Sequence, residues 1–168
     1  MLGLEAITWN DALEEKGAWD TMVWMATLIG LAGFLNSLGL IPWFAKNIAG
    51  MISGMSWVWA LLILLILYMY SHYAFASLSA HITALYPAFA PVAVAAGAPP
   101  YLVALSLAFV SSLCASLTHY STGPAPVYFG PGYVSQGRWW KNGFIIGTTN
   151  LIIFLVIGGL WWKVIGLW

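Results

Sequence analysis

Two short polar clusters hold the side chains that could do chemistry in this sequence. The first is "SLSAH", residues 77–81, and the second is "THYSTGP", residues 118–124. Serine and threonine hydroxyls and unpaired backbone amides donate hydrogen bonds, and a protonated histidine adds positive charge. This combination is suited to holding an anion without any lysine or arginine.

The second cluster cannot lie in an uninterrupted helix. Proline lacks an amide donor and clashes with the carbonyl one turn earlier, so Pro124 and Pro126, next to Gly123, must open the backbone. Irregular backbone is tolerated at membrane depth only where it is buried in protein or lines a watery cavity. There the hydroxyls of Thr118, Ser121 and Thr122 either coordinate a ligand or satisfy the carbonyls that a simple proline kink sets free.

The first cluster lies between two apolar stretches, "SWVWALLILLILYMYSH" and "ITALYPAFAPVAVAAG". Such arms around a polar tip form either one crossing followed by a polar loop or a hairpin that enters and leaves by the same membrane face. Composition leaves both arrangements open. In a hairpin, the amides that begin the second arm carry partial positive charge at membrane depth and would stabilise an anion.

The elements that position these clusters belong to a membrane protein. Of 168 residues, 62% are hydrophobic and 6% are charged, and no Asp, Glu, Lys or Arg occurs between Lys46 and Arg138. A helix needs about 20 apolar residues to cross the hydrocarbon layer, so the chain holds several crossings or part-crossings. The net charge of zero argues against a nucleic-acid partner, and the single cysteine, Cys114, predicts neither a disulfide nor a metal cluster.

The pattern predicts an all-α membrane protein with six segments. Small residues in the first predicted crossing allow close helix packing. The stretch after it is amphipathic and therefore suits the membrane interface. Tryptophan pairs flank the last predicted crossing. The acidic N-terminus lacks the basic residues of a leader, so we expect a fragment of a longer transporter. The segments are an acidic cytoplasmic linker (1–20), a transmembrane helix (21–40), an interfacial helix (42–55), a helical hairpin (56–97), a broken transmembrane helix (100–137) and a last transmembrane helix (139–165).

Several stretches resemble the C-terminal part of the divalent anion/sodium symporter family. They are "AWDTMVWMATLIGLAGFLNSLGLIPWF", "FASLSAHITALYP", "SLCASLTHYSTGPAPVYFGPGY" and "GRWWKNGF" with the ending "GGLWWKVIGLW". They look closest to its 2-oxoglutarate/malate, citrate/succinate and tartrate/succinate translocators. The resemblance implies the second of two inverted repeats of a secondary transporter, with a re-entrant hairpin and a broken transmembrane helix.

In that family the hairpin bears a Ser-Asn-Thr motif and the broken helix a Thr-Pro-Pro-Asn turn. Here residues 77–79 stand at the first motif and residues 122–125 at the second, so Leu78 and Ala125 replace the two asparagines. The resemblance implies that hydroxyls and nearby amides hold one substrate carboxylate, while the matching repeat holds the other. The candidate substrate-binding residues are Ser77, Leu78, Ser79, Ser121, Thr122, Gly123 and Pro124.

The loss of both asparagines puts a standard sodium site in doubt. Ala76, His81 and His119 lie where the family places its coupling cation, and an imidazolium there would supply in fixed form the charge that sodium supplies. Neutral histidines bonded between helices are the alternative, and His72 is assigned to packing. With a fixed positive charge, the empty binding site is too polar to move across the membrane, and only the loaded carrier changes conformation. We therefore expect an anion exchanger. It needs no cofactor except, at most, Na⁺ as coupling ion.

The sequence therefore predicts a transporter and not an enzyme. We expect alternating-access transport of di- or tricarboxylates (succinate, malate, 2-oxoglutarate, citrate or tartrate) across the cytoplasmic (inner) membrane, with several crossings. The expected partners are the anion, the lipid bilayer, the N-terminal half of the transporter and a second copy in a homodimer. If the hairpin opens outward, residues 1–20 and the loop "SQGRWWK" are cytoplasmic, in line with a weak excess of Lys and Arg on that side.

Three other functions stay open at this point. Sodium-coupled dicarboxylate symport would use the same fold. A haem-binding subunit would need histidines facing each other from separate crossings, and the proline-rich surroundings of His119 suit that poorly. A structural subunit of a larger complex is the third, because half a carrier should not transport.

Overall fold

A computed structural model describes the chain, and every regular element in the described part is helical. There is no strand among the described residues, so the all-α prediction is confirmed. The described residues run from Thr8 to Trp168, without positions 17–18, 20–21, 24–25, 28–29, 32–33, 35–36 and 76.

Four helices form the body of a bundle, and a fifth, longer helix lies against it. The four are α3 (Leu40–Ile52), α4 (Trp57–Ser71), α5 (Leu78–Ala95) and α6 (Pro100–Leu113). The long helix consists of α8 (Gln136–Ile153), the π-helical η4 (Phe154–Gly158) and α9 (Gly159–Val164). The short elements are α1 (Trp9–Glu14), η2 (His72–Ala74), η3 (Cys114–Ser116) and α7 (Ala125–Phe129).

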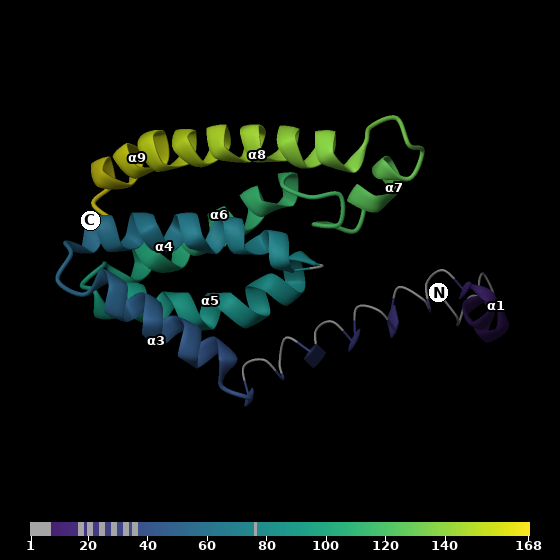
Figure 1. Ribbon diagram of the computed structural model, residues 1–168, viewed down its shortest axis with the longest axis horizontal. Coiled ribbons are helices and arrows are strands. Elements are labelled where there is room, and N and C mark those ends of the chain that lie inside the picture. The colour runs from purple at the N-terminus through teal and green to yellow at the C-terminus, as the bar shows by residue number, and fades with distance from the viewer. Residues whose placement is uncertain are drawn as a thin grey trace.

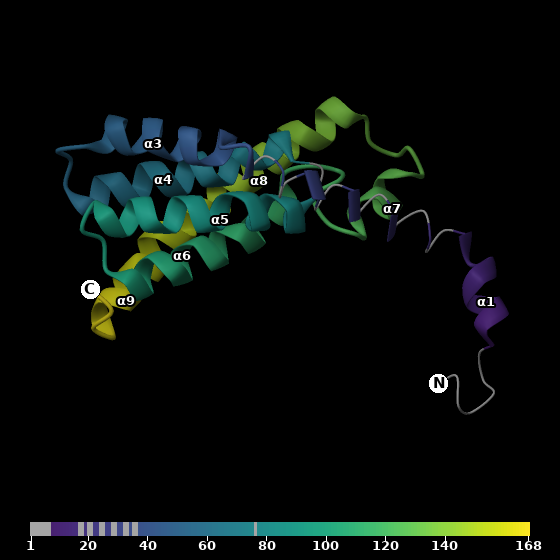
Figure 2. The ribbon, with the colours of Figure 1, turned by 90° about the horizontal axis from the view of Figure 1, so that it is seen from below.

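The arrangement brings segments that are distant in sequence next to each other. Figures 1 and 2 show α3, α4 and α5 side by side, with α8 and α9 on the far side of α4 and α6. The end of α4 and the start of α5 meet at one end of the bundle, near the segment that joins α6 to α7 (Figure 1). The two predicted polar clusters therefore lie at the same end.

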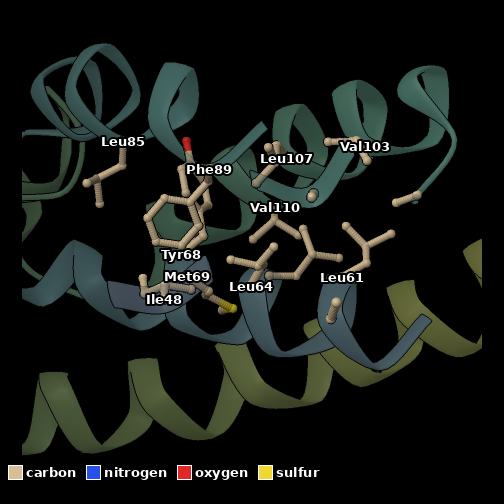
Figure 3. Packing of buried hydrophobic residues seen from close by; sticks show 14 of the residues in the cluster. Ile48, Leu61, Leu64, Tyr68, Met69, Leu85, Phe89, Val103, Leu107 and Val110 are labelled. Carbon is tan, nitrogen blue, oxygen red and sulfur yellow. The ribbon is translucent and has the colours of Figure 1, made fainter. Parts of the chain in front are cut away.

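A shared layer of apolar side chains holds α4, α5 and α6 together. Leu64 and Tyr68 of α4, Phe89 of α5, and Leu107 and Val110 of α6 are each at most 1% exposed. Figure 3 shows these side chains converging between the helices. Because the three helices bury one common layer, the two arms of the hairpin and the helix that precedes the second break are held in a fixed relation.

In the part of the chain that the structure describes, three helices are long and apolar enough to cross a membrane, namely Trp57–Ala74, Leu78–Ala95 and Gln136–Val164. The chain is therefore part of a multi-pass membrane protein. The predicted crossing at 21–40 falls partly on positions outside the described residues. Each arm of the predicted hairpin is long enough to span by itself, so the re-entrant character of the hairpin stays a prediction.

The short amphipathic helix predicted at 42–55 corresponds to α3. Ile48 and Ile52 are each 4% exposed, whereas Met51 is 75% exposed. This buried stripe packs α3 against α5, and α3 runs alongside that helix and not across its end (Figure 2). The interfacial position of α3 stays a prediction. Its orientation, parallel to the length of α5, does not favour it.

Two prolines inside α5 do not end it. Pro87 and Pro91 are both within Leu78–Ala95. Their spacing of four puts both missing amide donors on one face of the helix, so the hydrogen bonds of the other faces can continue. Pro124 and Pro126 do not end a helix either, because α6 already ends at Leu113 and η3 at Ser116. Pro124 is the N-cap of α7 and Pro126 lies in its first turn, where a missing amide donor costs no helical hydrogen bond.

Candidate functional site

The first helix break lies between α4 and α5, and a capping serine begins the helix that follows it. After η2, Phe75 is extended and Ser77 begins α5 as its N-cap residue. The Ser77 hydroxyl accepts a hydrogen bond from the Ala80 amide at 3.1 Å, and the Ser77 carbonyl accepts one from the His81 amide at 3.1 Å. Serine is a strong N-cap because its side chain satisfies an amide that the helix cannot.

The two breaks meet through their backbones. The amide of Leu78, the first residue of α5, donates a hydrogen bond to the carbonyl oxygen of Ser121 in the second break at 3.1 Å. Ser79 stands next to this bond, is exposed, and makes no hydrogen bond through its amide or hydroxyl with the other described residues. The start of α5 therefore offers two unused donors beside the junction, at the positive end of the helix dipole.

The second break is stabilised from inside by Ser121. Its buried hydroxyl lies 2.7 Å from the carbonyl oxygens of both Ala115 and Thr118 and donates its proton to them. Both carbonyls lie where the helical hydrogen bonds have ended. Ser121 thus acts structurally here, and its backbone carbonyl, not its side chain, contacts the hairpin.

Thr122, Gly123 and Pro124 form the outer part of the second break. The Thr122 hydroxyl makes no hydrogen bond with a described residue, and its carbonyl accepts from the Ala125 amide at 3.1 Å. Gly123 and Pro124 are exposed. Together with Ser79, the Thr122 hydroxyl is a free donor close to the Leu78–Ser121 hydrogen bond.

Helix α8 supports the second break from behind through two glycines. A side chain at Gly143 would collide with the carbonyl oxygen of Leu117 and would lie 2.6 Å from that of Ser116. One turn later, a side chain at Gly147 would lie 2.7 Å from Leu117 Cδ2. Only glycine lets α8 come this close to the opened end of α6, because small residues allow helix backbones to approach each other.

His119 lies in an aromatic surrounding. Its Nδ1 atom accepts a hydrogen bond from the indole nitrogen of Trp140 at 3.1 Å, and its ring lies 4.4 Å from the ring of Phe129, centroid to centroid. An indole N–H only donates, so Nδ1 must carry a lone pair, as it does in the neutral ring with its proton on Nε2. Protonation of His119 would break this hydrogen bond.

His81 and His72 lie beneath the hairpin tip. Both rings are 0% exposed, and His81 Nε2 lies 2.9 Å from the carbonyl oxygen of Tyr68. The sequence indicated His81 as a candidate but assigned His72 to packing, because a lone histidine in an apolar run carries no local signal of its surroundings. Ala76, the third predicted cation-site residue, lies outside the described residues.

These features define the class of protein. The chain is part of a multi-pass helical membrane protein in which the turn between α4 and α5 contacts the non-helical segment after η3. Secondary transporters build their binding sites from non-helical segments of this kind. The whole chain, residues 1–168, matches the family described as the sodium:sulfate symporter transmembrane region, and the chain belongs to that family. The resemblance predicted from the sequence is confirmed.

Named relatives are transporters of carboxylates. The chain is 56% identical to the putative malate transporter YflS of Bacillus subtilis, covering 98% of this chain and 34% of that protein. It is 51% identical to the chloroplastic dicarboxylate transporter 1 of Spinacia oleracea, with 96% and 29% covered. It is 37% identical to the L-tartrate/succinate antiporter of Escherichia coli, with 98% and 34% covered. The chain thus spans about a third of the length of these relatives.

Proposed function

We propose that the protein of which this chain is part carries dicarboxylates across a membrane by anion exchange with alternating access. The Leu78–Ser121 hydrogen bond carries the proposal, because it joins the two breaks and leaves the donors of Ser79 and Thr122 beside the junction. The names of the relatives support a dicarboxylate as the substrate class. Under this proposal the protein is a carrier and not an enzyme.

The site binds one carboxylate group of the substrate. Ser79 donates from its hydroxyl and amide, Thr122 donates from its hydroxyl, and the α5 dipole adds partial positive charge. Ser77 and Ser121 position these donors through their own hydrogen bonds. Tricarboxylates fit the same chemistry, and the second carboxylate is held by the part of the transporter outside this chain, which supplies the other inverted repeat.

For the wider arrangement we propose what the family resemblance implies. The hairpin is re-entrant, the intact protein forms a homodimer, and it lies in the cytoplasmic membrane with residues 1–20 inside. The surroundings of His81 and His119 differ, because the Nδ1 lone pair of His119 accepts a hydrogen bond from Trp140. We therefore assign a positive charge next to the substrate to His81 and not to His119.

Sodium-coupled symport is the second candidate function, and the description of the family as a sodium symporter favours it. The haem-binding alternative fits the geometry poorly. The rings of His72 and His81 are in edge contact, with centroids 5.1 Å apart, and this leaves no space for a porphyrin between two axial nitrogens.

Counterflow in liposomes tests the proposal. The whole transporter is reconstituted with unlabelled succinate, malate or 2-oxoglutarate inside, and labelled succinate uptake is followed with and without sodium. We expect uptake that needs an internal dicarboxylate and does not need sodium. Uptake that requires sodium and needs no internal anion would overturn the exchanger and favour symport.

Two variants locate the site. Ser79→Ala and Thr122→Val should each raise the KM for succinate about tenfold, because each removes a hydrogen bond to a charged group of about 1.5 kcal/mol. Ser112→Ala is the matched control, since Ser112 is an exposed serine of α6 that makes no hydrogen bond with a described side chain. If the control changes KM as much as the two site variants do, the site is misplaced.

A further inference from the structure

Two buried histidines face each other just inside the hairpin tip. His72 belongs to η2 at the end of the first arm, and His81 lies one turn into α5. Both are 0% exposed, and their rings meet edge to face with centroids 5.1 Å apart at 77°. The pair is linked directly to the site, because the His81 amide donates to the carbonyl of the capping residue Ser77.

The ring nitrogens of this pair are largely without partners. A carbonyl oxygen only accepts, so His81 Nε2 donates to Tyr68, with Ser71 Oγ also within 3.0 Å. Nδ1 of neutral His81 therefore carries a lone pair. That atom and both ring nitrogens of His72 are buried and have no hydrogen-bond partner among the described residues. Buried polar atoms are nearly always paired, so three unpaired nitrogens in contacting rings need an explanation.

The described residues around the pair supply no counter-charge. Tyr68 of α4 packs on the His81 ring, at 4.4 Å between centroids, and donates or accepts through its hydroxyl with Ser111 of α6. Phe75 covers another side at 5.2 Å. Cys114 of η3 donates its thiol hydrogen to the carbonyl oxygen of Met69. No Asp, Glu, Lys or Arg occurs between Lys46 and Arg138.

We propose that His72 and His81 form a binding site for one proton, which is taken up when a dicarboxylate binds at the hairpin tip. This inference rests on the proposed function and names a coupling ion for it. The proton binds to Nδ1 of His81, and a nitrogen of His72 accepts the resulting N–H. One proton thus turns two unpartnered lone pairs into a hydrogen-bonded pair.

The coupling follows from electrostatics. A buried positive charge is costly when it is alone, and a nearby anion lowers that cost because charges interact strongly where water is excluded. The tip and the pair are one helical turn apart, so a carboxylate at Ser79 stabilises the protonated pair. By linkage, the protonated pair strengthens carboxylate binding by the same factor. The charge is therefore not fixed in the protein but arrives with the substrate.

Calorimetry of succinate or malate binding to the detergent-solubilised whole transporter, in buffers of different ionisation enthalpy at pH 7.5, counts the protons. The slope of the binding enthalpy against the buffer enthalpy gives the number of protons taken up per anion. We expect a value approaching one, and a Kd that rises with pH towards the limit for one proton of about tenfold per unit. His72→Gln and His81→Gln should lose the uptake and flatten the pH dependence.

His119→Gln is the matched comparison, because it makes the same replacement at the third histidine. Proton uptake should persist in it, whatever its effect on affinity. Anion binding by the wild-type protein with no proton uptake would overturn the inference, and this result does not depend on whether any variant folds. Uptake that survives in folded His72→Gln would overturn it as well. No binding of succinate, malate, 2-oxoglutarate or tartrate would overturn the proposed function and the proton site with it.

Discussion

The two helix breaks differ in what stabilises them. At the hairpin tip a local side chain does so, because Ser77 caps the helix that it precedes. At the second break the support comes from elsewhere in the chain, from the close approach of Gly143 in α8 as well as from the Ser121 hydroxyl. The comparison shows that the first break can be reformed locally, whereas the second depends on the correct packing of a separate helix.

Gly143→Ala should have the largest effect. The added methyl group collides with the backbone carbonyls of Leu117 and Ser116, which cannot rotate away as a side chain can. Overpacking of this kind costs about 3 kcal/mol or more. The expected result is a marked fall in the thermal unfolding temperature of the whole transporter, measured by tryptophan fluorescence, together with loss of transport.

Gly137→Ala is the control for this change, since Gly137 belongs to the same helix and a methyl group there meets nothing within 4 Å. It should be neutral or slightly stabilising, because alanine favours a helix. Equal unfolding temperatures for the two variants would show that α8 does not support the break.

Ser121→Ala should have the next largest effect. It removes the hydroxyl donor shared by two carbonyls inside the second break. The Thr118 carbonyl keeps the Ser121 amide as a donor, whereas the Ala115 carbonyl loses this hydrogen bond, and an acceptor left without a partner costs about 1–3 kcal/mol. Hydrogen exchange measured by mass spectrometry should show faster exchange in the segment from Leu117 to Ala125. The tip peptide should change less, and the comparison between the breaks fails if the tip changes more.

Ser77→Ala should be milder, because loss of an N-cap costs about 1 kcal/mol. Faster exchange is expected for the Ala80 amide, which loses its acceptor. Ser79→Ala provides the contrast, as its hydroxyl has no partner among the described residues and its loss should leave stability unchanged while it weakens anion binding. Equal destabilisation by the two serine variants would contradict the capping role of Ser77.

Trp140→Phe should have the smallest effect. It removes the hydrogen bond to His119 Nδ1, a part-buried contact worth about 0.5–1.5 kcal/mol, and keeps an aromatic ring in place. The thermal unfolding temperature of the whole transporter, measured by circular dichroism, should therefore fall only slightly. A fall as large as that of Gly143→Ala would show that the indole contributes more than this one hydrogen bond.

The sequence allowed the positions of both breaks to be predicted, because their signals are local. Pro124 and Pro126, next to Gly123, exclude a helix that continues through this stretch, although α6 already ends at Leu113. Ser77 is a typical N-cap residue before an apolar run. The resemblance to the family motifs at residues 77–79 and 122–125 then indicated which hydroxyls are candidates for substrate binding. These arguments need only covalent structure and the immediate neighbours in the chain.

The features that depend on long-range packing could not be predicted in the same way. In the sequence, nothing distinguishes Gly143 from other small residues of membrane helices, because its role depends on the contact of α8 with the segment after α6. The neighbours of His72 in the sequence likewise give no sign of its role, because its contact with His81 forms only when α4 and α5 pack together. The pairing of Leu78 with Ser121 likewise follows from how three helices pack.

The hydrogen bond between Leu78 and Ser121 has a consequence for how this protein can vary. Both atoms belong to the main chain, so exchanging either side chain leaves donor and acceptor in place. The side chains around this hydrogen bond can therefore be substituted during evolution, and the substrate preference can change with them. The backbone contact between the two halves of the site is kept. Among the common amino acids only proline at position 78 would delete it, because proline has no amide hydrogen to donate.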